Sequence, residues 1–221
     1  MSDSESQVRL FPQASKTPFR SRIPEHLVQA WHPSFDEEAE PLVSVYLTSE
    51  AFTQFMDHSR SDLENEVGGG LVGSRHVDTR TEEQFVLIEA VIPARFTRHG
   101  NAFLTFTQDT LVAMNDELNE RFPKRQLVGW YHTHPRMGIF LSHYDLWLHN
   151  HFFPEPWQVA LVIEPHAGLG GFFIRQKDGD IDHLRYFGFY EILTQGTSVV
   201  SWCNMHPEGE IPDGKGENDN E

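Results

Sequence analysis

The chain has 221 residues, a single cysteine and a formal net charge of −16, which suits one ordinary domain with terminal segments and excludes an intramolecular disulfide. No apolar run approaches the ~20 residues that cross a membrane, and the first residues lack the apolar stretch of a signal peptide, so we expect a cytoplasmic protein without a membrane partner. Residues 42–206 keep a charge of −8 once the −3 on residues 1–41 and the −5 on residues 207–221 are set aside, and an acidic body disfavours nucleic acid as a partner because such binding relies on a basic face.

Composition divides the chain into three parts. Residues 1–41 mix Ser, Pro, Arg and acidic residues with little periodicity, and we expect a flexible or loosely docked N-terminal arm that aromatic residues such as Trp31 can pin to the body. Residues 207–221 combine acids with glycines, a composition typical of a disordered tail. Residues 42–206 carry the pattern of a folded domain.

Within this domain, predicted strands alternate with predicted helices. This alternation indicates an α/β fold, in which a sheet is covered by helices. Helical spacing predicts one helix after Ser49 as N-cap, one after Thr107 as N-cap, and one at residues 142–152. The expected apolar face of the second helix is Leu111, Val112, Met114, Leu118 and Phe122. Apolar and β-branched runs predict strands at residues 42–47, 84–92, 103–106, 126–132, 157–163, 171–175 and 184–190. Residues 66–73 are a glycine-rich entry into a further strand.

Two histidines stand at the end of the strand predicted at residues 126–132. His132 and His134 are two residues apart, and side chains at that spacing in a strand point to the same face, so both imidazoles can converge on one ion. Alone, such a pair more often decorates a strand than binds a metal. Pro135 ends the strand at once, however, which places both rings at a strand end facing the next helix, a common location for α/β active sites.

Ser142 and Asp145 begin that next helix and share one of its faces. One interpretation is a capping box, with Ser142 as N-cap and Asp145 near position N3. The other is that two neutral imidazoles and a carboxylate form a three-ligand set, which leaves a fourth zinc position open for water. Both can hold, because a capped helix start is rigid and a metal ligand needs a rigid support.

Glu66 precedes a run of three glycines, residues 68–70. A solvated acidic helix end is the ordinary interpretation of this region. Glycines after a charged residue let backbones approach closely, however, and so indicate a crowded place in the fold. Glu64 is the nearest competitor for a functional carboxylate, but it stands two residues further from the turn.

Together, the segment Glu66-Val-Gly-Gly-Gly-Leu-Val-Gly73, the motif His132-Thr-His134-Pro and Ser142-x-x-Asp145 resemble the JAMM (MPN+) metalloprotease family over residues 42–190. The resemblance implies an α/β fold with a mixed curved β-sheet packed by helices, of cytidine-deaminase-like architecture. Members of this family are zinc isopeptidases that cleave ubiquitin or ubiquitin-like proteins from conjugates, or related bacterial and archaeal peptidases.

The resemblance also implies a role for each residue of the motif. His132, His134 and Asp145 would bind one catalytic Zn²⁺, Glu66 would hold the zinc-bound water and act as general base, and Ser142 would stabilise the oxyanion. None of the five departs from the family pattern, so the catalytically inactive branch of the family is not expected.

The implied substrate is a ubiquitin-like protein or its conjugates, cleaved after the C-terminal glycine in deconjugation, precursor processing or both. Residues 138–142 and 152–163 are similar to JAMM proteins of bacterial (Bil-type) ubiquitin-like conjugation operons, which implies cognate activating and conjugating enzymes as partners and a role in antiphage defence. The alternatives are a sulfur-carrier or small-peptide processing peptidase of the same chemistry, and a non-catalytic MPN-type binding scaffold. In a further hypothesis, residues 1–41 block the substrate groove.

A second histidine cluster has a weaker pattern. His149 and His151, with Cys203 and His206 near the end of the chain, have unconvincing spacing for zinc and only one thiol. We therefore expect surface or hydrogen-bonded histidines here, and no second structural zinc.

Overall fold

The computed structural model describes residues 17–35, 39–95, 98–100, 103–194 and 196–209. Its centre is a ten-stranded mixed sheet in the order β10-β9-β8-β4-β5-β3-β11-β2-β12, with β1 pairing to the far end of β4. A two-stranded hairpin, β6 and β7, stands apart from it. The helices are α1 (Ser49–Ser59), α2 (Gln108–Arg121) and α3 (His143–Phe152), with a short 3₁₀ turn at Glu25–Leu27. The strands are β1 (Phe19–Ser21), β2 (Val28–Pro33), β3 (Ser44–Thr48), β4 (Gly68–Asp78), β5 (Gln84–Pro93), β6 (Arg98–Gly100), β7 (Phe103–Thr105), β8 (Gln126–Thr133), β9 (Val159–Glu164), β10 (Leu169–Phe173), β11 (Phe189–Ile192) and β12 (Met205–Pro207).

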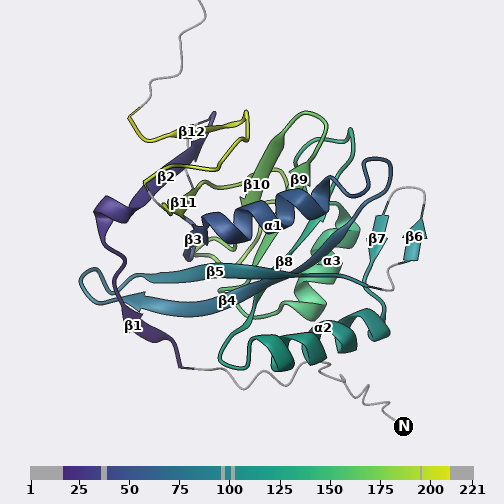
Figure 1. Cartoon of the computed structure of the whole chain (residues 1–221), viewed down its shortest axis with the longest axis horizontal. Helices are drawn as coiled ribbons and strands as arrows, with labels where there is room; N and C mark the ends of the chain where they lie inside the picture. Colours follow the sequence, from purple (N-terminus) through teal and green to yellow (C-terminus); the bar gives the residue numbers. More distant parts are fainter. Residues whose placement is uncertain (1–16, 36–38, 96–97, 101–102, 195, 210–221) are drawn as a thin grey trace, which may run out of the picture.

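Helices cover both faces of the curved sheet (Figure 1). The apolar face of α1 packs in one core, whereas α2 and α3 contribute to a second core on the opposite face. The wholly buried strand β9 shows the division, because Val159, Leu161 and Ile163 lie in the first core while Ala160 and Val162 lie in the second. Alternate residues of a strand point to opposite faces, so this strand serves both layers. The mixed α/β architecture expected from the sequence is confirmed.

The helix starts are built from local hydrogen bonds. Thr107 caps α2 as expected, its hydroxyl oxygen accepting from the Thr110 backbone N–H at 3.2 Å. The predicted N-cap of α1 was wrong by one residue: Thr48 accepts from Ala51 N–H at 3.2 Å, and Ser49 instead donates to the Ile192 carbonyl in β11. Thr48 and Ser49 both carry a hydroxyl that could cap the helix. Because the Ser49 hydroxyl bonds to β11, Thr48 is the cap.

Two further expectations differ from the structure. Val112, predicted on the buried face of α2, is 47% exposed, because the residues that reach the core are Leu111, Met114 and Leu118. The strand predicted at residues 184–190 begins only at Phe189, since Asp182 accepts backbone N–H bonds that make a turn at residues 182–185. Leu184 in that turn is exposed.

Part of the segment predicted as an N-terminal arm lies inside the main sheet. β2 pairs with β11 on one side and β12 on the other, and Ala30 and Trp31 are buried. Trp31 donates from Nε1 to Glu191 Oε2 at 3.1 Å, which ties the strand to the body. Residues 1–16, 36–38 and 210–221, which include most of the predicted tail, lie outside the described residues.

Among the described residues, no helix is long and apolar enough to cross a membrane.

The pairing of β8 with β9 depends on Gly129. A Cβ atom at this position would lie 2.0 Å from the carbonyl oxygen of Val159, and a paired backbone cannot retreat without losing sheet hydrogen bonds. We expect Gly129→Ala to lower the free energy of unfolding by about 3 kcal/mol, at the upper end of overpacking costs. Gly70→Ala is the matched control: its Cβ would meet the flexible end of Leu127 at 2.7 Å, and about 1 kcal/mol is expected. Urea unfolding measures both, and equal losses would contradict this explanation.

Candidate metal centre

Two buried histidines at the end of β8 form the first half of the centre. His132 and His134 point their Nε2 atoms at each other, 2.9 Å apart. The strand holds them in place through its neighbours, since His132 is opposite Gly68 of β4 and Val162 of β9. His134 lies just past the strand, where its backbone N–H donates to the Ile163 carbonyl at 2.8 Å. The structure thus brings the two rings together as the spacing predicted.

Asp145 completes the cluster from the first turn of α3. Its Oδ1 lies 3.4 Å from His132 Nε2, and its Oδ2 lies 3.8 Å from His134 Nε2. Burial favours the neutral acid, but electrostatic attraction to His132 and the polar contacts with both histidines and Ser142 outweigh it, and the pKa of Asp145 falls well below its usual range. The carboxyl group is therefore an anion, as a metal ligand must be.

The three side chains fit a zinc ion. Each offers one ligand atom, and these atoms all lie within 4.8 Å of one another. Tetrahedral zinc with bonds of ~2.0–2.1 Å places its ligand atoms about 3.3–3.4 Å apart. The two imidazole nitrogens are 2.9 Å apart, and the Asp145 oxygen nearest to each lies at 3.4 Å (Oδ1 to His132) and 3.8 Å (Oδ2 to His134), which is the range that one shared ion requires. Without such an ion, a buried cluster of two imidazoles and a carboxylate would pack polar atoms closely with few partners to stabilise them.

Glu66 lies beside this cluster, 8% exposed, with Oε1 3.9 Å from His134 Nε2. Its position follows from the next residue: Val67 N–H donates to Thr133 Oγ1 at 2.9 Å, and Thr133 N–H donates to the Val67 carbonyl at 2.8 Å. Thr133 stands between the two histidines, so this double hydrogen bond aligns Glu66 with them. The glycines that follow lie in the crowded place that the sequence indicated, because a Cβ on Gly69 would meet the Ile92 carbonyl oxygen at 2.2 Å.

Glu64, the competing carboxylate, points elsewhere. Its side chain is 72% exposed and accepts from the Arg136 guanidinium at 3.2 Å on both oxygens. The guanidinium holds the pKa of Glu64 below its usual value through those hydrogen bonds. The described structure therefore places Glu66 at the cluster and Glu64 in a surface ion pair.

Ser142 is the N-cap of α3, which confirms the capping box. Its hydroxyl oxygen accepts from Asp145 N–H at 3.2 Å, and its own backbone N–H donates to Asp145 Oδ2 at 2.7 Å. Because the serine oxygen is the acceptor in the cap, its own hydrogen is not used by that bond. The cap and the proposed oxyanion contact are thus compatible in one residue.

One residue that shapes the site was not found from the sequence. Glu164 is buried at the end of β9, and its carboxylate accepts backbone N–H bonds from Arg136, His166 and Ala167 at 2.6–3.0 Å. Although burial opposes ionisation, these three donors lower its pKa. Arg136 has a φ of 60°, so Glu164 stabilises the left-handed turn that follows His134. The signal in the sequence was an acid at the end of an otherwise apolar strand.

The second histidine cluster does not assemble around a shared point. His149 is fully buried and meets Trp130 and Arg175, whereas His151 contacts the Trp147 carbonyl at 2.8 Å on the outer side of α3. Cys203 is exposed. In the part of the chain that the structure describes, His132, His134 and Asp145 form the one group of three such side chains close enough to hold a metal.

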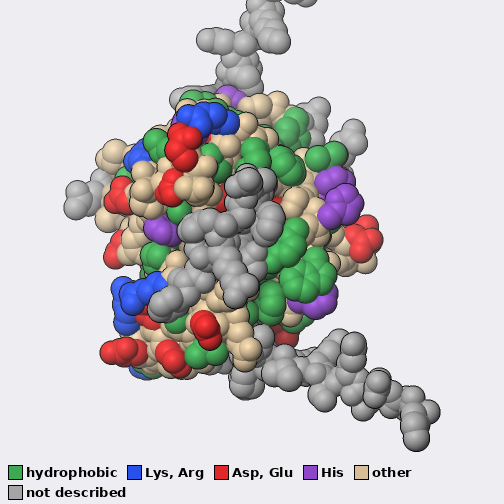
Figure 2. All heavy atoms as spheres, turned by 90° about the vertical axis from the view of Figure 1, so that its right-hand side faces the viewer, with side chains coloured by type: hydrophobic (Ala, Val, Ile, Leu, Met, Phe, Trp, Pro, Cys, Tyr) green, Lys and Arg blue, Asp and Glu red, His purple; other side chains and the backbone are tan. Residues whose placement is uncertain are grey.

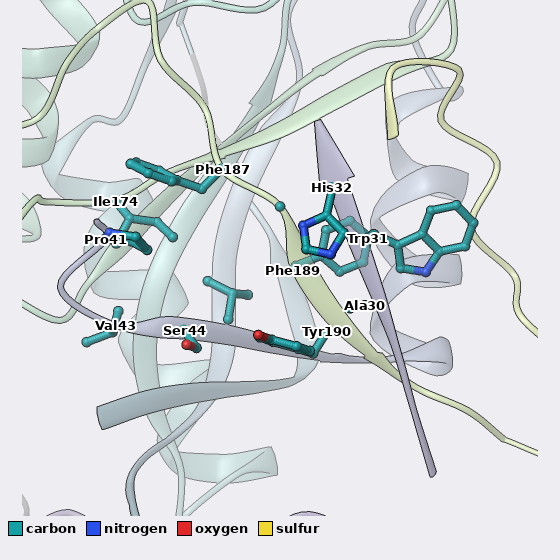
Figure 3. A pocket seen from close by; sticks show the side chains of 12 residues that line it. Ala30, Trp31, His32, Pro41, Val43, Ser44, Ile174, Phe187, Phe189 and Tyr190 are labelled. Atoms are coloured by element: carbon teal, nitrogen blue, oxygen red, sulfur yellow. The ribbon is translucent and has the colours of Figure 1, made fainter. Parts of the chain in front are cut away.

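A pocket elsewhere in the sheet is distinct from this centre. It opens between β2, β3 and β11, with Trp31, Pro41, Phe187 and Phe189 among its mainly apolar lining (Figure 3). In the sheet order, β4 and β5 separate β3 from β8. None of the five predicted site residues lines it.

The chain is similar to several known proteins. The chain is 28% identical over 127 residues to the Lys-63-specific deubiquitinase BRCC36 of Pongo abelii, covering 47% of this chain and 51% of that protein. It is 28% identical over 131 residues to the 26S proteasome regulatory subunit RPN11 of Eremothecium gossypii, covering 58% and 40%. The matches thus span about half or less of these relatives. Protein DSY2949 of Desulfitobacterium hafniense, a solved structure, gives a TM-score of 0.46 at 23% identity, with coverage of 64% and 91%.

The family described as JAB1/Mov34/MPN/PAD-1 ubiquitin protease matches residues 40–153, which is more than half of the 221 residues. This range contains the whole cluster, from Glu66 through the histidine pair to Asp145. The chain belongs to the JAB1/Mov34/MPN/PAD-1 family.

Proposed function

We propose that the protein is a zinc-dependent isopeptidase that cleaves after the C-terminal glycine of a ubiquitin-like protein. The observation that carries this proposal is the position of Glu66, a buried carboxylate 3.9 Å from a ligand atom of the cluster formed by His132, His134 and Asp145. A metal site alone suits a structural role. A carboxylate next to a three-ligand site with an open position suits hydrolysis.

The chemistry divides among the chain's own residues. His132, His134 and Asp145 would hold the ion, which when bound lowers the pKa of a water molecule from 15.7 toward ~7. Glu66 would take the proton of that water and deliver it to the leaving amine. Ser142, its hydrogen not used in the cap, would donate to the developing oxyanion, a contact typically worth about 3 kcal/mol.

Two observations support a protein rather than a short peptide as the substrate. BRCC36, which this chain resembles, is a Lys-63-specific deubiquitinase. In addition, α3, which carries Asp145, bears Trp147, 46% exposed and stacked on Tyr144. Figure 2 shows hydrophobic and histidine side chains gathered on one side of the face that it presents. Exposed aromatic residues on the helix that carries a ligand favour contact with a folded partner.

For the cellular setting, we propose a bacterial ubiquitin-like conjugation system. The similarity to JAMM proteins of bacterial conjugation operons supports a cognate ubiquitin-like modifier, with activating and conjugating enzymes as further partners and antiphage defence as the role. Processing of a sulfur carrier or of small peptides would use the same chemistry on another substrate. A non-catalytic scaffold is the alternative from a different class.

A panel of substrates tests the proposal. Fusions of ubiquitin-like proteins to a reporter, and short peptides with the same Gly-Gly end, are incubated with the full chain, and zinc is counted per chain by elemental analysis. We expect about one zinc per chain and cleavage of at least one fusion at the glycine. Cleavage of peptides alone would favour the small-substrate alternative, and bound zinc without any turnover would favour the scaffold.

A further inference from the structure

A buried pair of residues next to the metal centre joins β8 and α3, the two elements that carry metal ligands. Trp130 lies on β8 two residues before His132, and His149 lies on α3 four residues after Asp145. Trp130 Nε1 donates to His149 Nδ1 at 3.1 Å, and both residues are fully buried.

The sequence spacing of Trp130 and His149 places their contact alongside the contact between the ligands His132 and Asp145. Two residues advance a strand by about 6.6 Å, and four residues advance a helix by about 6 Å. The pair Trp130–His149 therefore joins β8 to α3 one step further along than the pair His132–Asp145, whose atoms are 3.4 Å apart. The Trp130–His149 contact fixes the separation of β8 and α3, and with it the distance between His132 and Asp145.

Trp130 also orients a ligand directly. Its indole stacks on the His132 ring with centroids 4.6 Å apart and planes 10° apart. Ligand histidines usually have their second nitrogen held by a hydrogen bond, but no described protein group bonds to the buried Nδ1 atoms of His132 and His134. Ring packing, by Trp130 on His132 and by Phe140 on His134 at 4.7 Å, therefore contributes to the orientation of both ligand rings.

Arg175 lies at the other ring nitrogen of His149 and bears on which nitrogen carries the lone pair. Its Nη1 lies 2.9 Å from His149 Nε2, and its guanidinium also donates to the Glu155 carbonyl and the Asn150 side chain at 3.1 and 3.0 Å. A neutral imidazole has one lone pair and so accepts from one donor at a time. Arg175 donates to the Glu155 carbonyl and the Asn150 side chain, so it does not need His149 as an acceptor. Trp130 donates to His149 Nδ1. We therefore assign the lone pair of His149 to Nδ1.

We propose that Trp130 and His149 are positioning residues that hold the His132 ring and the distance between α3 and β8, and so determine how tightly the centre binds its metal. This inference rests on the metal site of the proposed function, but not on its substrate. It assigns a role to His149, which the sequence offered only as a hydrogen-bonded histidine.

Zinc affinity of the full chain, measured by competition with a chromogenic chelator, tests the pair without any assay of turnover. His149→Leu removes the acceptor, and we expect zinc binding to weaken about 10-fold, the lower end of the cost of losing a direct outer-shell partner, because His149 acts through Trp130. His149→Gln restores an acceptor and is expected to recover most of the affinity. His151→Leu, on the outer side of the same helix, is the matched control and should bind zinc like the unchanged chain.

A purely structural role predicts a different pattern. If His149→Leu lowers the melting temperature of the metal-free protein while its zinc affinity stays within twofold, the proposal is overturned. Should that variant not fold, Trp130→Phe carries the test, because it keeps a ring on His132 but removes the donor; several-fold weaker zinc binding supports the proposal, and unchanged binding refutes it. An unchanged chain that binds no zinc would overturn this inference, whereas zinc binding without cleavage would overturn only the isopeptidase.

Discussion

Replacing Glu66 with glutamine is expected to reduce kcat by about 10²- to 10⁴-fold, the range that a general acid–base group contributes. The amide keeps the size and the polar surface of the carboxylate but cannot accept the proton of a metal-bound water. Because Glu66 is not one of the three clustered ligand-bearing side chains, zinc content and the free energy of unfolding should remain close to those of the unchanged chain. Turnover of the best fusion substrate, zinc analysis and urea unfolding measure the three quantities.

Glu64→Gln is the matched control for this variant. Glu64 is chemically identical, two residues away, and occupied in an exposed ion pair with Arg136. Exposed pairs contribute at most about 1 kcal/mol, so the control should keep its activity. Full activity in Glu66→Gln, with loss in Glu64→Gln, would move the base to Glu64 and require a rearrangement of the loop.

Removal of Asp145 is expected to abolish stoichiometric zinc binding. With one of three ligands gone, two imidazoles remain, fewer than the three or four protein ligands of typical zinc sites. Asp145 also accepts from Ser142 N–H in the capping box, so Asp145→Ala should in addition lower the stability of the metal-free protein by about 1 kcal/mol, the net worth of one such hydrogen bond.

Asp145→Asn separates the two roles. The asparagine oxygen can still accept the capping bond, but the neutral amide is a poor ligand for zinc compared with a carboxylate. We expect Asp145→Asn to lose zinc like the alanine variant, while its metal-free stability stays close to that of the unchanged chain. Zinc analysis and urea unfolding after chelation measure the two effects. Stoichiometric zinc in Asp145→Ala would remove this residue from the ligand set.

Zinc removal should also lower the thermal stability of the unchanged chain. A ligand that binds only the folded state stabilises it by RT ln(1 + [L]/Kd), about 2.7 kcal/mol at a hundredfold excess over Kd. The melting temperature should therefore fall on chelation in the unchanged chain and in Glu66→Gln, and should not change in Asp145→Ala. A chelator-dependent shift in Asp145→Ala would show that another site binds the ion.

Local patterns predicted the features that depend on neighbouring residues. The caps at Thr107 and Ser142 need a hydroxyl and a backbone N–H three residues on, and both are visible in the sequence. The pairing of His132 with His134 needs only the two-residue period of a strand. Where two adjacent residues could serve equally, as at Thr48 and Ser49, the local pattern gave the wrong cap, because the contact of Ser49 with Ile192 decides it.

The sequence by itself therefore determined the residue types of the candidate site, the three helices and most strands between residues 42 and 190, and the resemblance that names the family. The tertiary structure alone placed Glu66 at the cluster and Glu64 outside it, since the hydrogen bonds that align Glu66 join Val67 to Thr133, 66 residues further along the chain. It also placed β2 between β11 and β12, and His149 in contact with Trp130, which stacks on His132. Such contacts depend on sheet register and on the distance between packed elements, which hydrophobic period and capping residues do not specify.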